Sequence, residues 1–455
     1  MTRAAALLLL LAGCAAAPEA TIYRERDRTT PHALAPRPHY PSYGASVGRQ
    51  PIPWSAESLA GDFEELLFVA EWGEETDHLL RFEGPVRVAL AGPELRAYRP
   101  YLEDLVARIS AAAPGLDLAV APGERGEITL RPAPPEEMDK VAPEALCFFI
   151  PFDGTWSEFR AAEARGETFW DGLDQYRAIT VFLPRYAAPH EIRSCIEEEV
   201  TQALGPANDI LRLEDSIFND DNAQGKATAF DLLMLRVLYD PSLHSGMSRA
   251  EAKAAALRVL SGAGTGRARR APSRADRVYA DLTARADSAP RPAEQALWVG
   301  RAIEMAADFG PVDHRLPAAV LEAGHIAYFD RREGDAAALL RRAEALLLQR
   351  LGPDALRLAG VRGDLGAILL RLGDPAGALA ALDAAVPVLA ANADDWRLAH
   401  ALRWRALALA ETGRAAEAKA EAARAVEWAA WVYGADSRAA RAWASDFAEI
   451  GLSAG

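Results

Sequence analysis

The sequence predicts an α+β domain with a mixed sheet, followed by an all-α domain of helical hairpins. Three observations lead to this prediction. Short apolar runs with strand periodicity alternate with amphipathic helical segments as far as about residue 261. Beyond residue 275 the composition changes to Ala, Leu, Arg and Glu in helical patterns. In that second part, glycines recur at a nearly constant interval, which is typical of a repeat protein.

The elements of the first domain, expected over 52–261, follow from the period of their apolar residues. Five segments alternate or are continuously apolar, as strands are: 86–90, 116–121, 127–131, 145–151 and 178–184. Four segments have apolar residues at helical spacing: 59–72, 93–113, 189–204 and 228–239. Thr228 can cap the last of these helices, and Asp231, three residues later, can return the bond.

The second domain, expected over 275–455, has a period near 40 residues. Gly334, Gly373 and Gly413 are spaced 39 and 40 residues apart. Small residues lie seven positions before these glycines, and aliphatic residues lie thirteen positions after them: Ala327, Gly366 and Ala406, then Leu347, Val386 and Val426. We expect each glycine to form the turn of a hairpin, and the small residues to let its two helices approach closely.

This pattern resembles tetratricopeptide repeats in a longer variant, and the alternative is an irregular helical bundle. An irregular first hairpin is expected over 275–310 and a closing helix over 436–451. Stacked hairpins present extended surfaces that suit a protein or peptide partner. Trp396 and Trp404 could line such a surface or pack between hairpins.

The acidic composition excludes one class of partner. The formal net charge is −15 and the isoelectric point is near 5.2, which argues against nucleic acid or anionic lipid as the main partner. The charge says nothing of the oligomeric state.

The N-terminus has the pattern of an export signal. A basic start and a short apolar run end at Leu11-Ala12-Gly13-Cys14, which resembles the lipobox of bacterial lipoproteins. The resemblance implies a signal peptide over 1–14, lipid on Cys14 and a periplasmic protein. Ala15 in place of Asp implies sorting to the outer membrane. An ordinary signal peptide is the alternative. The Pro-, Ala- and Arg-rich stretch 15–51 is expected to be a disordered tether, and 262–274 a linker.

Three cysteines are present, and two remain once Cys14 carries lipid. Export makes a disulfide between Cys147 and Cys195 the default expectation. Two buried thiols are the alternative.

Residues 197–209 resemble a metalloprotease zinc helix from which the histidines are missing. In H-E-x-x-H, two imidazoles four residues apart share one metal on one helix face. Here Glu198 and Gln202 occupy the histidine positions and Glu199 the general-base position. Gly205 is placed where the chain leaves the helix, and Asn208 stands in the position of the third ligand.

Further segments extend the resemblance. Ser216-Ile217-Phe218 falls where metzincins place their methionine turn, with Phe218 in the methionine position, and the helix opened by Thr228 ends Leu238-Tyr239. Together these segments resemble the exported bacterial family known as domain of unknown function 2927, over about 52–247. The relation to metzincins rests on spacing and element order. It implies that the strand before the motif helix is a sheet edge over which substrate would bind.

These observations favour a catalytically degenerate domain, a pseudo-metalloprotease, beside a protein-binding repeat domain, with no cofactor. Gln202, Asn208 and Asp209 are expected to form a hydrogen-bond network. The run 197–199 is expected to be a solvated helix face. The alternative is a divergent metal-dependent hydrolase, most plausibly a peptidase, with Glu199 as general base and a divalent cation on Glu198, Gln202, Asn208 or Asp209.

Overall fold

The computed structural model describes residues 32–69, 75–142, 145–219, 224–261, 266–268, 274–311 and 313–452. The expected lipidation site Cys14, the signal peptide 1–14 and the first part of the tether lie outside the described residues. The chain divides into two compact units. Among the described residues, the motif unit comprises 46–268, and the repeat unit comprises 32–45 together with 274–452.

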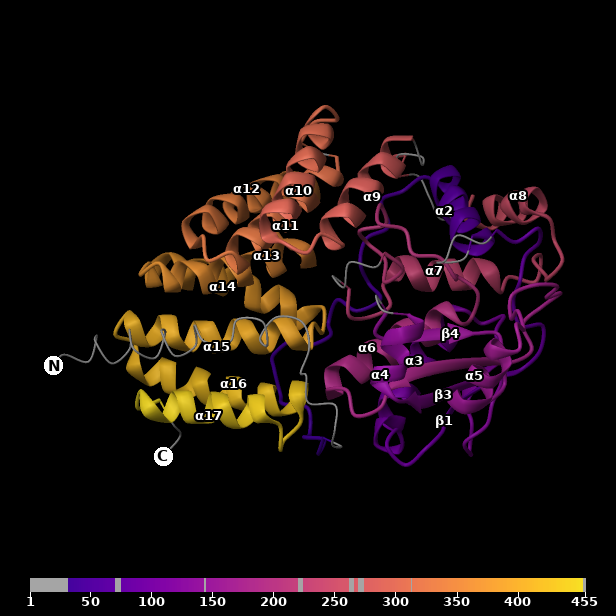
Figure 1. Cartoon of the computed structure of the whole chain (residues 1–455), viewed down its shortest axis with the longest axis horizontal. Coiled ribbons are helices and arrows are strands. Elements are labelled where there is room, and N and C mark those ends of the chain that lie inside the picture. The colour runs from indigo at the N-terminus through magenta and orange to yellow at the C-terminus, as the bar shows by residue number, and fades with distance from the viewer. Residues whose placement is uncertain are drawn as a thin grey trace. The chain divides into compact units, whose positions relative to one another are not determined.

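The motif unit is a mixed sheet with helices between and after its strands (Figure 1). Its described elements, in chain order, are α2 (Ala56–Phe68), β1 (Val86–Leu90), η1 (Arg96–Tyr98), α3 (Arg99–Ala112), β2 (Leu118–Val120), β3 (Ile128–Ala133), α4 (Pro135–Val141), β4 (Phe148–Ile150), α5 (Trp156–Ala164), β5 (Ile179–Pro184), α6 (Pro189–Gln202), α7 (Ala229–Leu238) and α8 (Arg249–Leu260). The predicted strands and helices are all present. The helices α4, α5 and α8 were not predicted; they have 7, 9 and 12 residues, and such short segments carry little periodic signal.

Within the described residues the sheet has five strands in the order β2-β1-β3-β5-β4. The strands β2, β1, β3 and β5 are parallel, and β4 is antiparallel to β5. Val181 of β5 pairs with Leu130 on one side and Phe149 on the other. The expectation that the strand before the motif helix lies at the sheet edge is therefore wrong, because 145–151 folds back and pairs outside it.

Alternate residues of β5 pack into different cores. Ile179, Val181 and Leu183 join a large cluster with apolar side chains of α2, α3, α6 and α7. Phe182 joins a smaller cluster with α4 and α5, where its ring lies 5.1 Å from that of Trp156. Both faces of β5 are thus buried, which explains its continuously apolar sequence. The motif helix α6 follows directly from this central strand.

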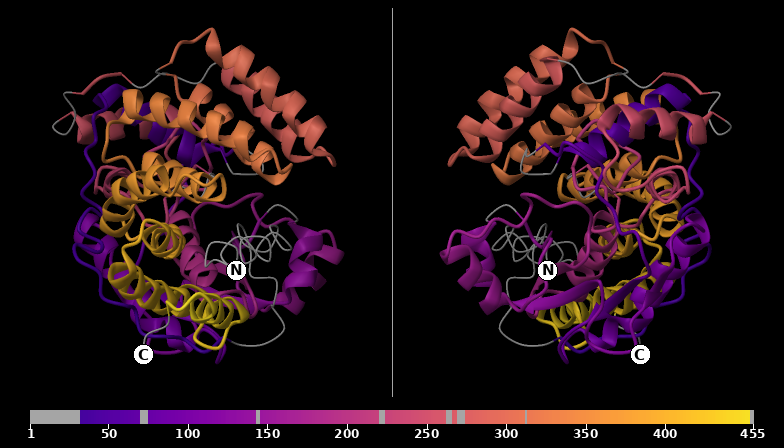
Figure 2. Two further views of the ribbon diagram at one scale, coloured as in Figure 1. Left: turned by 90° about the vertical axis from the view of Figure 1, so that its left-hand side faces the viewer. Right: turned by 90° about the vertical axis from the view of Figure 1, so that its right-hand side faces the viewer.

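The repeat unit is a series of helices in which each packs on the next (Figures 1 and 2). Its described helices are α9 (Arg274–Asp287), α10 (Pro292–Ala307), α11 (Arg315–Phe329), α12 (Glu333–Leu351), α13 (Leu356–Arg371), α14 (Pro375–Ala391), α15 (Asp395–Glu411), α16 (Ala415–Tyr433) and α17 (Arg438–Glu449). The predicted helical-hairpin repeats are confirmed, with α9 and α10 as the first hairpin and α17 as the closing helix. None of the described helices combines the length and apolarity needed to cross a membrane.

The turn between the two helices of a hairpin needs a residue with left-handed backbone conformation. We number the repeats from α11–α12 (the first) to α15–α16 (the third), and in the first repeat this residue is not the predicted one. Gly373 and Gly413 have φ of +78° and +80°, as expected of turn glycines. In the first repeat, Arg331 holds this position with φ of +61°, and Gly334 lies in the first turn of α12. The assignment of Gly334 to the turn is therefore wrong.

The close approach of paired helices depends on small residues. A Cβ at Gly366 would lie 2.5 Å from Leu382 Cγ, and one at Gly324 would lie 2.9 Å from Leu340 Cδ2. Gly324, and not the predicted Ala327, is thus the counterpart of Gly366 in the first repeat. Ala406 and Ala422, both buried, form the equivalent contact position in the third repeat.

The described part of the expected tether makes specific contacts. Ala33 and Gly44 form backbone hydrogen bonds with the repeat unit, and Gln50 Oε1 accepts a bond from the Ala229 N–H of the motif unit at 3.0 Å. Over the described part, 32–51, this differs from the expected disorder, because a sequence rich in proline and poor in apolar residues carries no periodic signal when it binds as an extended chain.

Candidate functional site: the motif helix and the loop after it

The motif helix α6 is buried over most of its surface. Pro189 occupies its first turn, and the Ala188 N–H donates to Glu191 Oε2 at 2.9 Å, which caps the start. The helix packs against β4, β5 and α3. The predicted disulfide is present between Cys147, just before β4, and Cys195 of α6, with Cα atoms 6.0 Å apart. It fastens the helix to the edge of the sheet.

The acidic run 197–199 is not a solvated face, so that expectation is wrong. Glu197 is 0% exposed and Glu199 is 5% exposed, while Glu198 is half-buried. Charged side chains rarely occupy such positions unless they are paired.

Glu197 is held by a cluster of cations and donors. Arg108 of α3 approaches its carboxylate to 2.8 Å and Lys226 to 3.6 Å. The Tyr101 hydroxyl donates to Oε2 at 3.0 Å, and the Ala227 N–H donates to Oε1 at 2.9 Å. Burial by itself would raise the pKa of Glu197, but Lys226 and Arg108 outweigh it and hold that pKa below its ordinary value. The carboxylate is therefore charged at neutral pH and ties α6 to α3 and to the start of α7.

Two side chains at the positions that the resemblance assigns to zinc ligands, Gln202 and Asn208, form hydrogen bonds within the motif unit. Gln202 Nε2 donates to Asp209 Oδ1 at 3.1 Å, and Asn208 Nδ2 donates to the Glu65 carbonyl oxygen at 3.1 Å. These bonds join α6, the loop after it and α2, as expected of a structural network. Both amides donate through their nitrogens in these bonds.

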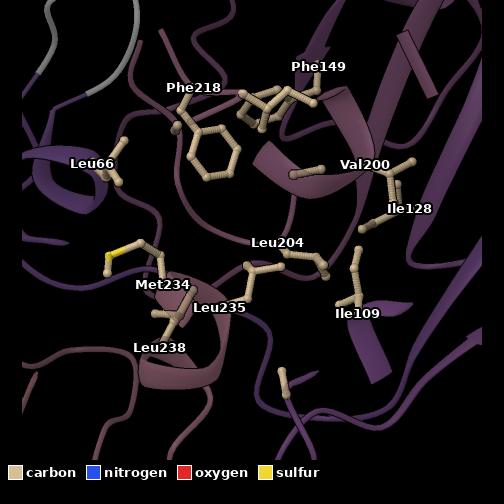
Figure 3. Close-up of a cluster of buried hydrophobic side chains, with 14 of the residues drawn as sticks. Leu66, Ile109, Ile128, Phe149, Val200, Leu204, Phe218, Met234, Leu235 and Leu238 are labelled. Atoms are coloured by element: carbon tan, nitrogen blue, oxygen red, sulfur yellow. The ribbon is translucent and has the colours of Figure 1, made fainter. Parts of the chain in front are cut away.

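Gly205 lets the chain leave α6 next to α7. Its φ is +150°, and a Cβ there would lie 2.4 Å from Leu238 Cδ2. The Tyr239 hydroxyl donates to the Leu204 carbonyl oxygen at 2.8 Å and holds the turn from the other side. Figure 3 shows Leu204 and Leu238 in one apolar cluster with Phe218. A side chain at 205 would be strained at this φ and would require the Leu238 side chain to move.

The loop that resembles the methionine turn is fixed by Asp231. Ser216 Oγ donates to Asp231 Oδ1 at 2.5 Å, and the Ile217 N–H donates to Oδ2 at 3.1 Å. The Thr228 N–H also donates to Oδ2, at 2.7 Å, and completes the predicted capping box. Burial raises the pKa of Asp231 to about 7, against the opposing effect of these bonds. Phe218 is fully buried in the core behind this loop.

The described residues contain no group of three or more His, Cys, Asp or Glu side chains arranged to hold a metal ion. The residues named for a cation are spread out: Glu198 is half-buried on α6, while Gln202, Asn208 and Asp209 take part in the bonds above. Glu199, the candidate general base, is buried on the same helix. The hydrogen bonds and ion pairs of these polar side chains connect α6 with α3 and with the loop after α6, and that loop with α2.

Sequence reasoning missed the partners of Glu197. Tyr101, Arg108 and Lys226 come from α3 and from the segment before α7, and none stands at a motif spacing. Lys226 Nζ also lies 3.9 Å from the centroid of the Tyr101 ring. Arg108 lies beside the apolar face of the amphipathic helix α3, but this position does not identify its partner.

A second candidate surface lies on the repeat unit, around Asp395 at the start of α15. Its carboxylate accepts hydrogen bonds from the Tyr43 hydroxyl and, at 2.7 Å, from Trp431 Nε1. The Tyr43 ring lies 5.4 Å from the ring of the fully buried Trp428. The predicted Trp396 and Trp404 are half-buried, and the Trp396 ring lies 4.5 Å from the His400 ring. The aromatic residues that hold a chain segment are thus on α16.

Comparison with known proteins identifies the first domain. Residues 56–258 match the model of a family described as protein of unknown function, DUF2927. The resemblance to this family predicted from the motif is confirmed over that range. No curated protein matches the chain.

Two solved structures resemble the repeats. Both are crystal structures of nearly identical TPR-like repeats described as those of a kinesin light chain from Podosopora anserina. They cover 40% and 39% of this chain and 89% and 87% of their own, with sequence identities of 15% and 14% and a TM-score of 0.33 in each case. The assignment of helical-hairpin repeats to this chain rests on its own helices.

Proposed function

We propose that this protein is a lipid-anchored envelope protein that binds a protein partner through its helical repeats. The observation that supports this most strongly is the extended segment 32–45, which is bound on α14, α15 and α16 through backbone and side-chain contacts. Stacked helical hairpins offer extended surfaces for such segments. A surface that holds one extended chain has the chemistry to hold another.

The motif unit is, in this proposal, a non-catalytic metzincin-like domain. The order of a mixed sheet, the motif helix, a fixed loop and a capped helix supports the resemblance. The side chains at two ligand positions, Gln202 and Asn208, instead bond to Asp209 and to the Glu65 carbonyl. Zinc favours imidazole, thiolate and carboxylate over neutral amides. Export, lipid on Cys14 and location at the outer membrane rest on the first 15 residues of the sequence.

Capture of partners from solubilised envelope tests the proposal. The full chain is compared with a chain that ends before residue 274, and captured proteins are quantified by mass spectrometry. At least one protein is expected to depend on the repeats. A truncated chain that retains every partner would contradict the proposal.

The same preparations test the hydrolase alternative. A metal-dependent peptidase would carry stoichiometric metal, and Glu199→Gln would abolish its peptide cleavage because the general base is lost. The non-catalytic proposal predicts that Glu199→Gln leaves both the metal content and the captured partners unchanged. Stoichiometric metal together with cleavage that this substitution abolishes would overturn it.

A further inference from the structure

The N-terminal strap, defined as residues 32–45, is anchored to the repeat unit at both of its ends. Near its start, the Ala33 N–H donates to Asp436 Oδ1 at 2.8 Å, and the Ala33 carbonyl accepts from the Ala435 N–H at 2.8 Å. Near its end, the Gly44 N–H donates to the Ala390 carbonyl at 2.9 Å. Bonds to backbone groups do not depend on side-chain identity. The surface therefore holds the backbone of an extended segment at Ala33 and of a turn at Gly44.

Two tyrosines, three residues apart, supply the side-chain anchors of the strap. Tyr43 reaches Asp395 with its hydroxyl and packs its ring beside Trp428. The Tyr40 ring lies 5.6 Å from the guanidinium carbon of Arg424. Aromatic side chains held in this way dominate the energetics of many interfaces.

The charges of the strap and its surface are complementary. The strap contains Arg37 and no acidic residue. The surface presents Asp395 and Asp436 directly to the strap, whereas Glu421, near the Tyr40 site, is already paired with Arg405 and Arg424. The Arg37 guanidinium carbon lies 4.7 Å from the centroid of the Tyr43 ring, so the cation stays close to these acids.

The strap sequence is suited to an extended conformation. Pro36, Pro38 and Pro41 disfavour helix, and residues 32–40 have no regular secondary structure. A turn follows, in which the Tyr43 N–H donates to the Tyr40 carbonyl at 3.2 Å. His32 lies over Gly434, where a Cβ would come 2.8 Å from His32 Cβ. Because its prolines already restrict the unbound strap, it loses less conformational entropy on binding than a flexible chain would.

One feature of the surface is not satisfied by the strap. The indole N–H of Trp428 is buried, and within the described part of the chain it has no hydrogen-bond acceptor. A buried donor without an acceptor costs free energy.

We propose that the strap is a resident ligand of the repeat unit, and that the partner is an extended segment of the same chemistry which displaces it. That segment has two tyrosines three residues apart, an arginine, flanking prolines and no acidic residue. The inference rests on the proposed function, because it assigns the occupant of the proposed binding surface. The strap competes in cis, at the high effective concentration that a covalent link provides.

A labelled synthetic peptide of residues 32–45, added to the full chain and followed by fluorescence anisotropy, tests the proposal. In the wild type the strap occupies the surface, so the peptide binds weakly. Tyr43→Ala releases the strap and is expected to tighten peptide binding by about tenfold or more. The reason is that the fraction of molecules with an unoccupied surface rises. Tyr43→Phe, which removes the hydroxyl alone, gives a smaller gain. The matched control His39→Ala, at an exposed strap position, binds the peptide as the wild type does.

The outcomes separate this inference from the proposed function. Adding Asp395→Ala to Tyr43→Ala must reverse the gain, because the peptide loses its anchor on α15. Equal peptide affinity in the wild type and the Tyr43→Ala chain, with helix content preserved by circular dichroism, would overturn the inference. So would a gain that survives Asp395→Ala. If the repeats still capture a partner in either case, the proposed function is retained, and only the competition between strap and partner is rejected.

Discussion

The motif unit and the repeat unit both bury charged groups, such as Glu197 and Glu421, but their most informative polar contacts join different things. In the motif unit, charged groups such as Glu197 and Asp231 lie inside and are bonded to residues from distant segments. In the repeat unit, glycine and alanine fill the helix contacts, while Asp395 and Trp431 face a bound chain segment. The residues that resemble an active site therefore hold the first unit together. The residues that suit binding stand on the second, where no motif drew attention to them.

The largest expected effect follows from removing the buried charge of the motif unit. Glu197→Gln leaves Arg108 and Lys226 without their counter-charge, so we expect the unfolding free energy to fall by about 3–5 kcal/mol. In the repeat unit, Glu417→Gln removes a carboxylate that is 57% exposed and pairs with Arg414, and we expect no measurable loss because water screens this pair. Urea denaturation followed by circular dichroism measures both. Equal losses would break the contrast between the units.

The stability difference between the wild type and Glu197→Gln should depend on pH, and the pKa of Glu197 gives the direction. Because the folded pKa of Glu197 lies below the ordinary value of 4.5, its contribution is fully present above that pH and is lost as the pH falls through the folded pKa. The difference in stability between wild type and Glu197→Gln should therefore shrink below about pH 4. A difference that grew in acid would show that the carboxylate is not held charged.

Reduction of the disulfide should affect one unit only. Cys147 and Cys195 both lie in the motif unit, and the sequence has no cysteine beyond Cys195. The bond closes a loop with a sequence separation of 48, and the entropy of such a loop corresponds to about 4 kcal/mol. Calorimetry with and without reductant should show the transition of the motif unit moving to lower temperature. A parallel shift of the repeat unit would mean that the two units unfold as one.

The smallest expected effect concerns the helix contacts of the repeat unit. Gly366→Ala places a methyl group against Leu382, and we expect a loss of about 1–3 kcal/mol from overpacking. Gly363, on the same helix, has no atom within 4 Å of an added Cβ. Gly363→Ala should therefore stabilise the unit by about 0.5–1 kcal/mol. Thermal denaturation of both variants would test whether close approach, and not helix propensity, selects Gly366.

Local patterns predicted much of this molecule. The strands, the long helices, the capping box of Thr228 with Asp231, the disulfide and the hairpin repeats all follow from short-range spacing or from the number of cysteines. The turn of the first repeat shows the limit of such patterns. Counting glycines identified Gly334, but the backbone adopts the left-handed conformation at Arg331, three residues earlier. Spacing reports residue types and does not report dihedral angles.

Long-range contacts were beyond the sequence. The bond between Arg108 and Glu197 spans 89 positions, and the bond between Tyr43 and Asp395 spans 352. No periodicity connects such pairs, so 197–199 had the pattern of a solvated run and 32–45 that of a tether. The order of the sheet could not be predicted either, because Val181 suits an edge and an interior strand equally well. Only the pairing of β4 outside β5 distinguishes the two.

The strap also has a temporal consequence. Ala33 and Asp436 are 403 positions apart, so a ribosome synthesises the strap long before it synthesises the helices that receive it. Throughout that interval the strap has no site, and the nascent chain can fold its motif unit and then stack one hairpin after another. The surface that receives the strap is complete only after Asp436, which follows α16, has been synthesised. A partner present at that moment meets an unoccupied surface, so the order of arrival could decide which segment is bound first.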